Sequence, residues 1–335
     1  MYKLEECGLY QRASSKRNRE LLRGGIGVFL AELDRWRKER GSLRNTCTFQ
    51  TVATKTQDAR SPVYCYELEG VDEESAVLTT WNGFDSFDDG NFRSVNGDSE
   101  PGETPEVFVE DAPEGGIRGY PSHFWLFPAH EKFATVRVES RLENGVPELR
   151  HYGRAFLRDH LPREGLDPKK SKSAIAVFDA KLKLDKATLA EIRKHRVNIT
   201  AVRGRNILRP VKKPRRAARW YDGLLGLVGV KMDTRDDVEH ELRDQRIDTT
   251  IHLEEKLSAE QLRDVFKGRP QLGYDDCDVG FVIKGDKTIW LGSAQATTTL
   301  NLDVELNEGI PSAKSLLASL RSVGGDEVEK LLRKA

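Results

Sequence analysis

The sequence predicts a two-domain α+β protein, in which mixed sheets pack against helices and a C-terminal amphipathic helix finishes the chain. At 335 residues the chain is longer than one hydrophobic core usually organises. Its 38% hydrophobic and 32% charged residues are typical of a folded globular protein. Stretches with strand-like alternation and stretches with helical spacing both recur along the chain. Two domains containing both kinds of element are therefore expected.

The first domain is expected to span residues 1–165. Strands are predicted at residues 3–12, 46–53, 63–68, 76–80, 124–127 and 135–141. A helix at residues 21–40 is indicated by the helical spacing of Ile26, Phe29, Leu30 and Leu33. Another at residues 149–161 would place Tyr152, Phe156 and Leu157 on one face. Between them, residues 83–119 are rich in Gly, Asp, Glu and Pro, which predicts a long acidic loop.

A second, α/β domain is expected at residues 171–293, after a linker at 162–173 that contains Lys169, Lys170 and Lys172. Strands and helices are predicted to alternate there. The strands are expected at residues 174–182, 197–203 and 248–253, and the helices at 186–195, from about 214 and at 259–266. A hairpin of residues 279–283 and 288–291 should turn at Gly285-Asp286.

The C-terminal segment, residues 303–335, is expected to form an amphipathic helix at 312–332. Leu316, Leu317, Leu320 and Val323 would form its apolar stripe, with a break at Gly324-Gly325. That stripe can pack on its own domain or serve as a dimerisation element.

Charge is segregated along the chain, although the formal net charge is zero. Eleven Lys and Arg and no acidic residue lie between Ile192 and Tyr221. Ten Asp and Glu and one basic residue, Arg93, lie between Asn82 and Gly116. A neutral average therefore hides a basic segment that could bind phosphate, because clustered Lys and Arg release counterions from nucleic acid.

The basic segment, residues 192–221, is the strongest functional signal in the sequence, and it predicts nucleic-acid binding. Lys and Arg neutralise phosphate charge, and Arg also binds phosphate oxygens with two nitrogens. The residues expected to contact DNA are Arg203, Arg205, Arg209, Lys212, Lys213, Arg215, Arg216 and Arg219. Alternatives are a solvated basic face, an anionic membrane surface, or an acidic protein partner. Trp220 and Tyr221 favour core packing over base stacking, because an apolar run follows them.

The acidic segment contains Asp85, Asp88, Asp89, Asp98, Glu100, Glu103, Glu106, Glu110, Asp111 and Glu114. A solvated loop is the simpler interpretation. The more specific hypothesis is that the acidic segment mimics phosphate, covers the basic segment in the free protein and restrains DNA binding.

Catalytic signals are few, and no enzyme activity, cofactor or metal is expected. Asp179 and Lys181, two apart on a predicted strand, could serve a metal-dependent nuclease if Asp159 or Asp167 supplied a further carboxylate. The seven histidines and four cysteines show no metal-ligand spacing. The sequence contains no signal-peptide pattern and no apolar run of membrane-spanning length, which predicts a cytoplasmic location.

Several short segments, spread in order over most of the chain, resemble the RexA family of phage-exclusion proteins. They are Gly8-Leu9-Tyr10 with Ser14-Ser15-Lys16, Val28-Phe29-Leu30, Tyr120-Pro121-Ser122-His123-Phe124 with Ala134-Thr135-Val136, and Tyr221 to Gly229 with Ile247-Asp248-Thr249. The resemblance implies a homodimer that binds DNA without sequence preference and signals to a small membrane effector encoded nearby. Abortive infection and exclusion of competing phages by a prophage would be the outcome. The acidic segment is longer than the family pattern, so its role is not inherited.

Overall fold

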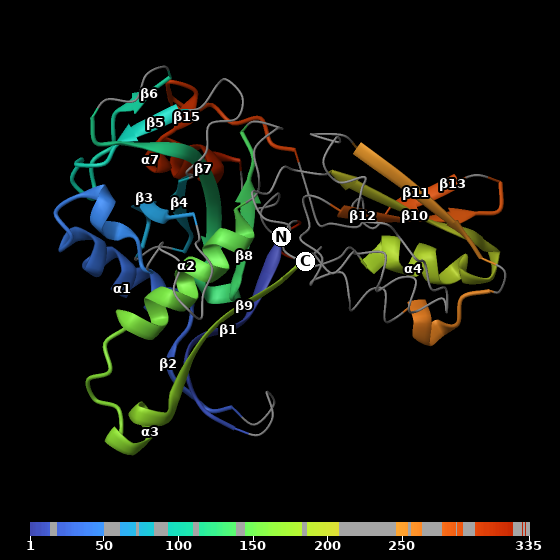
Figure 1. Cartoon of the computed structure of the whole chain (residues 1–335), viewed down its shortest axis with the longest axis horizontal. Coiled ribbons are helices and arrows are strands. Elements are labelled where there is room, and N and C mark those ends of the chain that lie inside the picture. The colour runs from blue at the N-terminus through green and yellow to red at the C-terminus, as the bar shows by residue number, and fades with distance from the viewer. Residues whose placement is uncertain are drawn as a thin grey trace, which may run out of the picture. The chain divides into compact units, whose positions relative to one another are not determined.

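The protein folds as two compact units (Figure 1). The computed structural model describes residues 1–13, 19–49, 61–71, 74–83, 93–109, 114–138, 145–182, 186–207, 246–253, 256–262, 277–285, 287–290, 299–323, 330 and 332. The first unit comprises Met1–Lys181 and Thr298–Arg333. The second comprises Leu182–Thr297 with Lys334–Ala335. Both contain helices and antiparallel strand pairs, which confirms the α+β class.

The first unit is built on one sheet, which has nine strands among the described residues. Its main path runs β2-β1-β8-β7-β4-β3, with β5 beside β7, β6 beside β5, and β9 beside β1. The strands are β1 (Tyr2–Gln11), β2 (Leu21–Gly24), β3 (Val63–Glu69), β4 (Ala76–Gly83), β5 (Arg93–Asn96), β6 (Val107–Phe108), β7 (Gly116–Phe127), β8 (Lys132–Val136) and β9 (Ala174–Leu182). Every residue of β4 is buried, so both faces of the sheet are covered there.

Two long helices, α1 (Ile26–Lys38) and α2 (Val146–Asp159), cover one face of this sheet. The ring of Phe29 meets Phe156 edge-on at 5.6 Å and lies 5.3 Å from Phe178 of β9. Gly153 allows α2 to approach β9 closely, because a Cβ there would lie 2.6 Å from the Phe178 ring. The two helices and β9 therefore share one aromatic core.

The opposite face is covered by the C-terminal segment, which returns after the second unit. There α7 (Ala313–Ser322) buries Leu316, Leu317 and Leu320, and the amide of Ala313 donates to the Glu67 carboxylate of β3. Ahead of it, the strand pair β14 (Leu306–Asn307) and β15 (Ile310–Pro311) places Ile310 in a buried cluster with Trp81. The apolar stripe of α7 thus packs within its own unit, not against a second subunit.

Three features differ from the expected first domain. Residues 21–24 form β2, not helix, because Gly24 packs tightly on β1: a Cβ there would lie 2.2 Å from the Cys7 carbonyl. Gly25, with φ 96°, then begins α1. Residues 43–46 form a 3-10 helix, η2 (Leu43–Thr46), and residues 47–49 are not a strand. Pairing of β9 with β1 moves the domain boundary later than the expected residue 171.

Where the structure describes the second unit, it contains a four-stranded sheet in the order β11-β10-β12-β13. Its elements are α4 (Lys186–Lys194), the 3-10 helix η4 (Arg196–Asn198), β10 (Ile199–Ile207), β11 (Arg246–His252), β12 (Cys277–Ile283) and β13 (Lys287–Trp290). All three strand pairs among the described residues are antiparallel, whereas alternating strands and helices of an α/β domain usually build a parallel sheet. The predicted hairpin is confirmed as β12 and β13. Val202 and Phe281, directly opposite each other, lie in its core with Ile192 and Leu262.

No helix among the described residues is long and apolar enough to cross a membrane.

The packing of α7 leads to a stability prediction. Replacing Leu316 or Leu320 with Ala should lower the free energy of unfolding by about 2–5 kcal/mol, because each change leaves a cavity against the sheet. Lys314→Ala, at an exposed position on the same helix, is the control and should change stability by less than about 0.5 kcal/mol. Denaturant unfolding measures both. Leucine variants as stable as the control would contradict the assigned packing.

Burial of His123 leads to a pH prediction. Its Nδ1 shares a 2.9 Å hydrogen bond with Thr79 Oγ1, and burial lowers its pKa from 6.5 to about 4. Between these values the unfolded chain binds a proton that the folded chain does not, so stability is lost as the pH falls through this window. The loss should reach about 3 kcal/mol. His123→Asn keeps a polar group facing Thr79 but does not titrate. Its unfolding free energy should therefore fall less between pH 6.5 and 4 than that of the wild type, and parallel curves would contradict the assignment.

Candidate nucleic-acid interface

The predicted DNA-binding residues lie in the second unit, and the structure describes two of them. Arg203 and Arg205 are on β10. The half-buried Arg203 donates from Nη1 to Thr288 Oγ1 of β13 at 3.3 Å. Arg205 occupies a register position between Asp248 of β11 and Asp278 of β12. The other six lie outside the described residues: Arg209, Lys212, Lys213, Arg215, Arg216 and Arg219.

Five basic residues gather at the other end of β10, where that strand begins. We call them the β10-start cluster: Arg193, Lys194, Arg196, Lys284 and Lys287. The first two belong to the last turn of α4, and Arg196 to η4. The two lysines belong to the turn between β12 and β13 and to the first residue of β13. Two pieces of chain far apart in the sequence, residues 193–196 and residues 284–287, therefore contribute.

Backbone hydrogen bonds hold these two pieces together and order the first of them. The Lys284 amide donates to the Asn198 carbonyl at 2.9 Å, directly beyond the pairing of Ile199 with Ile283. The Asn198 amide donates to the His195 carbonyl at 2.8 Å, which fixes η4 against the end of α4. Pairing of Ile283 with Lys287 places the two cluster lysines on one tight turn. The cluster is thus anchored by the sheet itself.

One carboxylate accompanies the cluster among the described residues. Glu191 of α4 forms an ion pair with Lys287, with 2.8 Å between Oε1 and Nζ. Hydrogen bonding and charge attraction from Lys287, with weaker contributions from His195 and Lys194, lower the pKa of Glu191. Arg193, Lys194, Arg196 and Lys284 form no ion pair within the described part of the chain. The cluster therefore presents a cationic excess to solvent, as a phosphate-binding surface requires.

Sequence reasoning found only part of this cluster. Arg193, Lys194 and Arg196 belong to the predicted basic segment, but the expected contacts were placed further along it, from Arg203 onward. Lys284 and Lys287 were missed because they lie about ninety residues later in the chain. The predicted hairpin turn, flanked by these two lysines, was the available signal. Its antiparallel pairing with β10 could not be read locally.

The acidic segment proves to be partly strand, so the long-loop prediction is wrong where the structure describes it. β5 pairs with β6 and β7, and Val95 and Val107 are buried with Trp81 in the first unit. Burial of these apolar side chains stabilises strands in a segment whose Gly, Asp, Glu and Pro content disfavours them. Five of the acids are exposed on this scaffold, namely Asp98, Glu100, Glu103, Glu106 and Glu114, and the remaining five lie outside the described residues.

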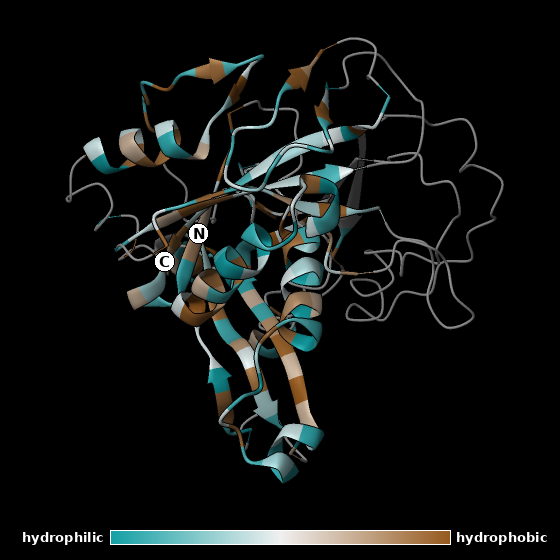
Figure 2. Cartoon of the chain, turned by 90° about the vertical axis from the view of Figure 1, so that its left-hand side faces the viewer, coloured by the Kyte–Doolittle hydropathy of each residue, from teal (hydrophilic) through white to brown (hydrophobic). Residues whose placement is uncertain are grey.

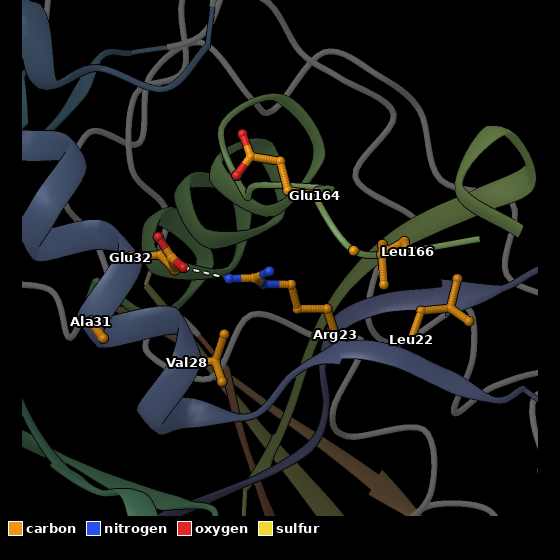
Figure 3. Close-up of a pocket in the computed structure, with 8 residues that line it drawn as sticks. Leu22, Arg23, Val28, Ala31, Glu32, Glu164 and Leu166 are labelled. Carbon is orange, nitrogen blue, oxygen red and sulfur yellow. Dashed lines mark hydrogen bonds and ion pairs between the residues drawn. The ribbon is translucent and has the colours of Figure 1, made fainter. Parts of the chain in front are cut away.

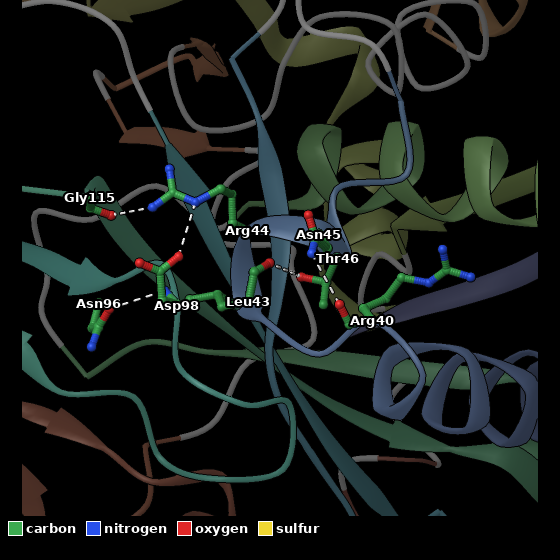
Figure 4. A network of polar contacts seen from close by, with 8 residues as sticks. All are labelled: Arg40, Leu43, Arg44, Asn45, Thr46, Asn96, Asp98 and Gly115. Atoms are coloured by element: carbon green, nitrogen blue, oxygen red, sulfur yellow. Dashed lines mark hydrogen bonds and ion pairs between the residues drawn. The ribbon is translucent and has the colours of Figure 1, made fainter.

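Asp98 of this segment is tethered within the first unit (Figure 4). Arg44 of η2 forms an ion pair with it, with 3.4 Å between Nε and Oδ1, and donates from Nη2 to the Gly115 carbonyl at 2.7 Å. The amide of Arg44 also donates to the Gly97 carbonyl at 2.9 Å. One arginine thus ties the middle of the segment to its C-terminal part. Its docking on the basic segment stays a prediction, because Lys212 to Arg219 lie outside the described residues.

Separate local partners occupy three of the four residues of the nuclease hypothesis, namely Lys181, Asp159 and Asp167. Lys181 pairs with Glu5 of β1. Asp159 pairs with its neighbour Arg158 at 2.6 Å, and Asp167 accepts from the Lys169 amide at 2.8 Å as the N-cap of α3 (Pro168–Ser173). Within the described ranges, no three His, Cys, Asp or Glu side chains come close enough to hold a metal ion. The hypothesis therefore gains no geometric support.

The first unit also has a surface hollow of about 450 Å³ between β2, α1 and the chain before α3 (Figure 3). Its apolar wall includes Leu22, Val28 and Leu166. Two of its charged groups form an ion pair, with 2.6 Å between Arg23 Nη2 and Glu32 Oε1, and the exposed Glu164 also lines it. Nothing in the hollow indicates a particular ligand.

Comparison with known proteins found no matching family model, curated protein or solved structure.

Proposed function

We propose that this protein binds DNA without sequence preference, through phosphate contacts made by the second unit. The observation that supports the proposal is the β10-start cluster, in which five cations from two chain segments accompany one carboxylate among the residues that the structure describes. Such an excess favours a polyanion, because each phosphate that is neutralised releases a counterion. Arg203, Arg205 and the basic residues from Arg209 to Arg219 would extend the contact along the chain.

The biological role proposed with this binding is that of a sensor in phage exclusion. The short segments that resemble the RexA family support it, as does the segregated charge. The active form would be a homodimer in the cytoplasm, since two copies double the number of phosphate contacts. The output would be a signal to a small membrane effector encoded nearby. Because the α7 stripe is covered within its own unit, the dimer contact would have to use another surface.

Charge reversal of the cluster tests the proposal. Arg193→Glu, Arg196→Glu and Lys284→Glu together should weaken binding to a 30-base-pair duplex by at least roughly tenfold, because attraction to phosphate is replaced by repulsion. The slope of log affinity against log salt should fall by about 0.9 for each phosphate that the variant no longer neutralises. Fluorescence anisotropy at several salt concentrations measures both quantities.

The control is a triple reversal at exposed lysines outside the cluster, Lys3→Glu, Lys256→Glu and Lys314→Glu, which equals the test variant in charge change. Circular dichroism checks that both variants fold. Equally weakened binding in the two variants would show that the loss comes from the net charge of the protein and not from the cluster. Absence of binding by the wild type would refute the proposed function. Repeating the titration with magnesium distinguishes DNA that is bound intact from DNA that is cleaved. Cleavage would favour the nuclease hypothesis.

Neutralising Glu191 should act in the opposite direction. Glu191→Gln frees Lys287 to contact phosphate and removes a repulsive charge, so DNA binding should tighten by roughly two- to fivefold at low salt and less at high salt. Glu260→Gln removes an exposed carboxylate elsewhere in the same unit and is the matched control. Equal tightening in both variants would show that Glu191 does not lie in the DNA-binding surface.

A further inference from the structure

The first unit has a basic surface of its own where α3 meets the end of the β1–β2 hairpin. Three of the six residues of α3 are lysines, and the helix contains no acid. At the bottom of Figures 1 and 2, α3 lies beyond the ends of the strands, and its ribbon is largely hydrophilic in the second view. The segment predicted as a linker is therefore an ordered, cationic projection.

Side-chain contacts fasten α3 to the hairpin. Lys170 Nζ lies 3.0 Å from Glu20 Oε2, and the Glu20 carbonyl accepts from the Gln11 amide at 2.9 Å. Arg12, the next residue, is thereby placed beside the same end of the sheet. Arg163 closes the preceding turn by donating to the Ser171 carbonyl at 2.9 Å.

The lysines of α3 divide between two faces of the helix. Lys170 is half-buried and turned toward Glu20, whereas Lys169 and Lys172 are exposed. Residues three apart in a helix are neighbours on its surface, about 5–6 Å between Cβ atoms. Lys169 and Lys172 thus form a cationic pair facing solvent, with exposed Arg12 on the adjoining hairpin.

The carboxylates at this end are largely committed elsewhere. Glu20 pairs with Lys170, Asp159 pairs with Arg158, and Asp167 accepts from the backbone amide of Lys169. Glu164 is the remaining exposed acid in the described part of this corner. In the same part of the chain, no ion pair neutralises Arg12, Lys169 or Lys172. The surface therefore carries unpaired positive charge on a braced support.

We propose that Arg12, Lys169 and Lys172 form a second phosphate-binding surface for the DNA backbone, separate from the β10-start cluster. The inference rests on the proposed function and adds to it that each unit contacts the polymer. Flexible lysines suit a backbone that presents one charge per strand about every 3.4 Å along the axis. Tethering two weak sites in one chain raises their combined affinity, because binding at one site increases the effective concentration at the other.

The test uses the full-length protein with Arg12→Glu, Lys169→Glu and Lys172→Glu. Affinity for the 30-base-pair duplex should fall by roughly tenfold or more, and the salt slope should fall by up to about 2.7, or 0.9 for each of three phosphates. The same Lys3, Lys256 and Lys314 reversal provides the matched control. Thermal unfolding of each variant checks that α3 and the hairpin remain folded.

The outcomes separate this inference from the function on which it rests. Loss of binding on reversal of the β10-start cluster, with wild-type affinity and slope after reversal of the α3 surface, would overturn the inference alone. Absence of wild-type binding would overturn both. A further arm measures binding to phosphatidylcholine vesicles containing phosphatidylserine. If the α3 reversal removed vesicle binding but left DNA binding unchanged, the surface would serve a membrane and the inference would also be wrong.

Discussion

Burial of β4 on both faces is the constraint on which the first unit depends. Each of its residues from Ala76 to Gly83 is buried, so the strand is stable only when both sides of the sheet are covered. The helices α1 and α2 cover one face of the sheet. The other side needs Ile310 and the leucines of α7, which come from the C-terminal part of the chain. Folding of this sheet therefore requires both ends of the sequence.

This requirement accounts for the division of the chain. After β9 the chain leaves the first unit, builds the second, and returns at Thr298 to supply the missing layer. The returning helix is fixed by polar contacts as well as by burial: the Ala313 amide meets Glu67, and Arg321 donates to the Ser75 carbonyl at 2.9 Å. Burial raises the pKa of Glu67, while the hydrogen bond from Ala313 favours its charged form. The second unit is thus an insertion between two parts of the first.

In both proposed DNA-binding surfaces, hydrogen bonds and ion pairs fix the backbone positions from which flexible basic side chains extend. In the second unit, the Lys284 amide bound to Asn198 joins a turn of the sheet to the segment before β10. In the first unit, Arg163 and the side chain of Asp167 hold α3 while Lys170 binds it to the hairpin. The charged ends remain in water, where they can exchange solvent ions for phosphate at little cost. Rigid anchors with mobile tips suit binding to a polymer without reading its sequence.

The sequence by itself determined what local patterns encode: the α+β class, β3, the cores of α1 and α2, and the β12–β13 hairpin with its Gly285 turn. It also showed that charge is segregated. Tertiary pairing decided the rest. The strands β5 and β6 form in an acidic, glycine-rich segment because Val95 and Val107 are buried in one cluster with Trp81. Local composition does not reveal this partner. The α7 stripe packs inward because β4 needs cover, and Lys284 joins Arg196 because β12 pairs with β10. Periodicity and turn chemistry act over a few residues, whereas such pairings depend on free energy gained between distant segments, which only the folded chain brings together.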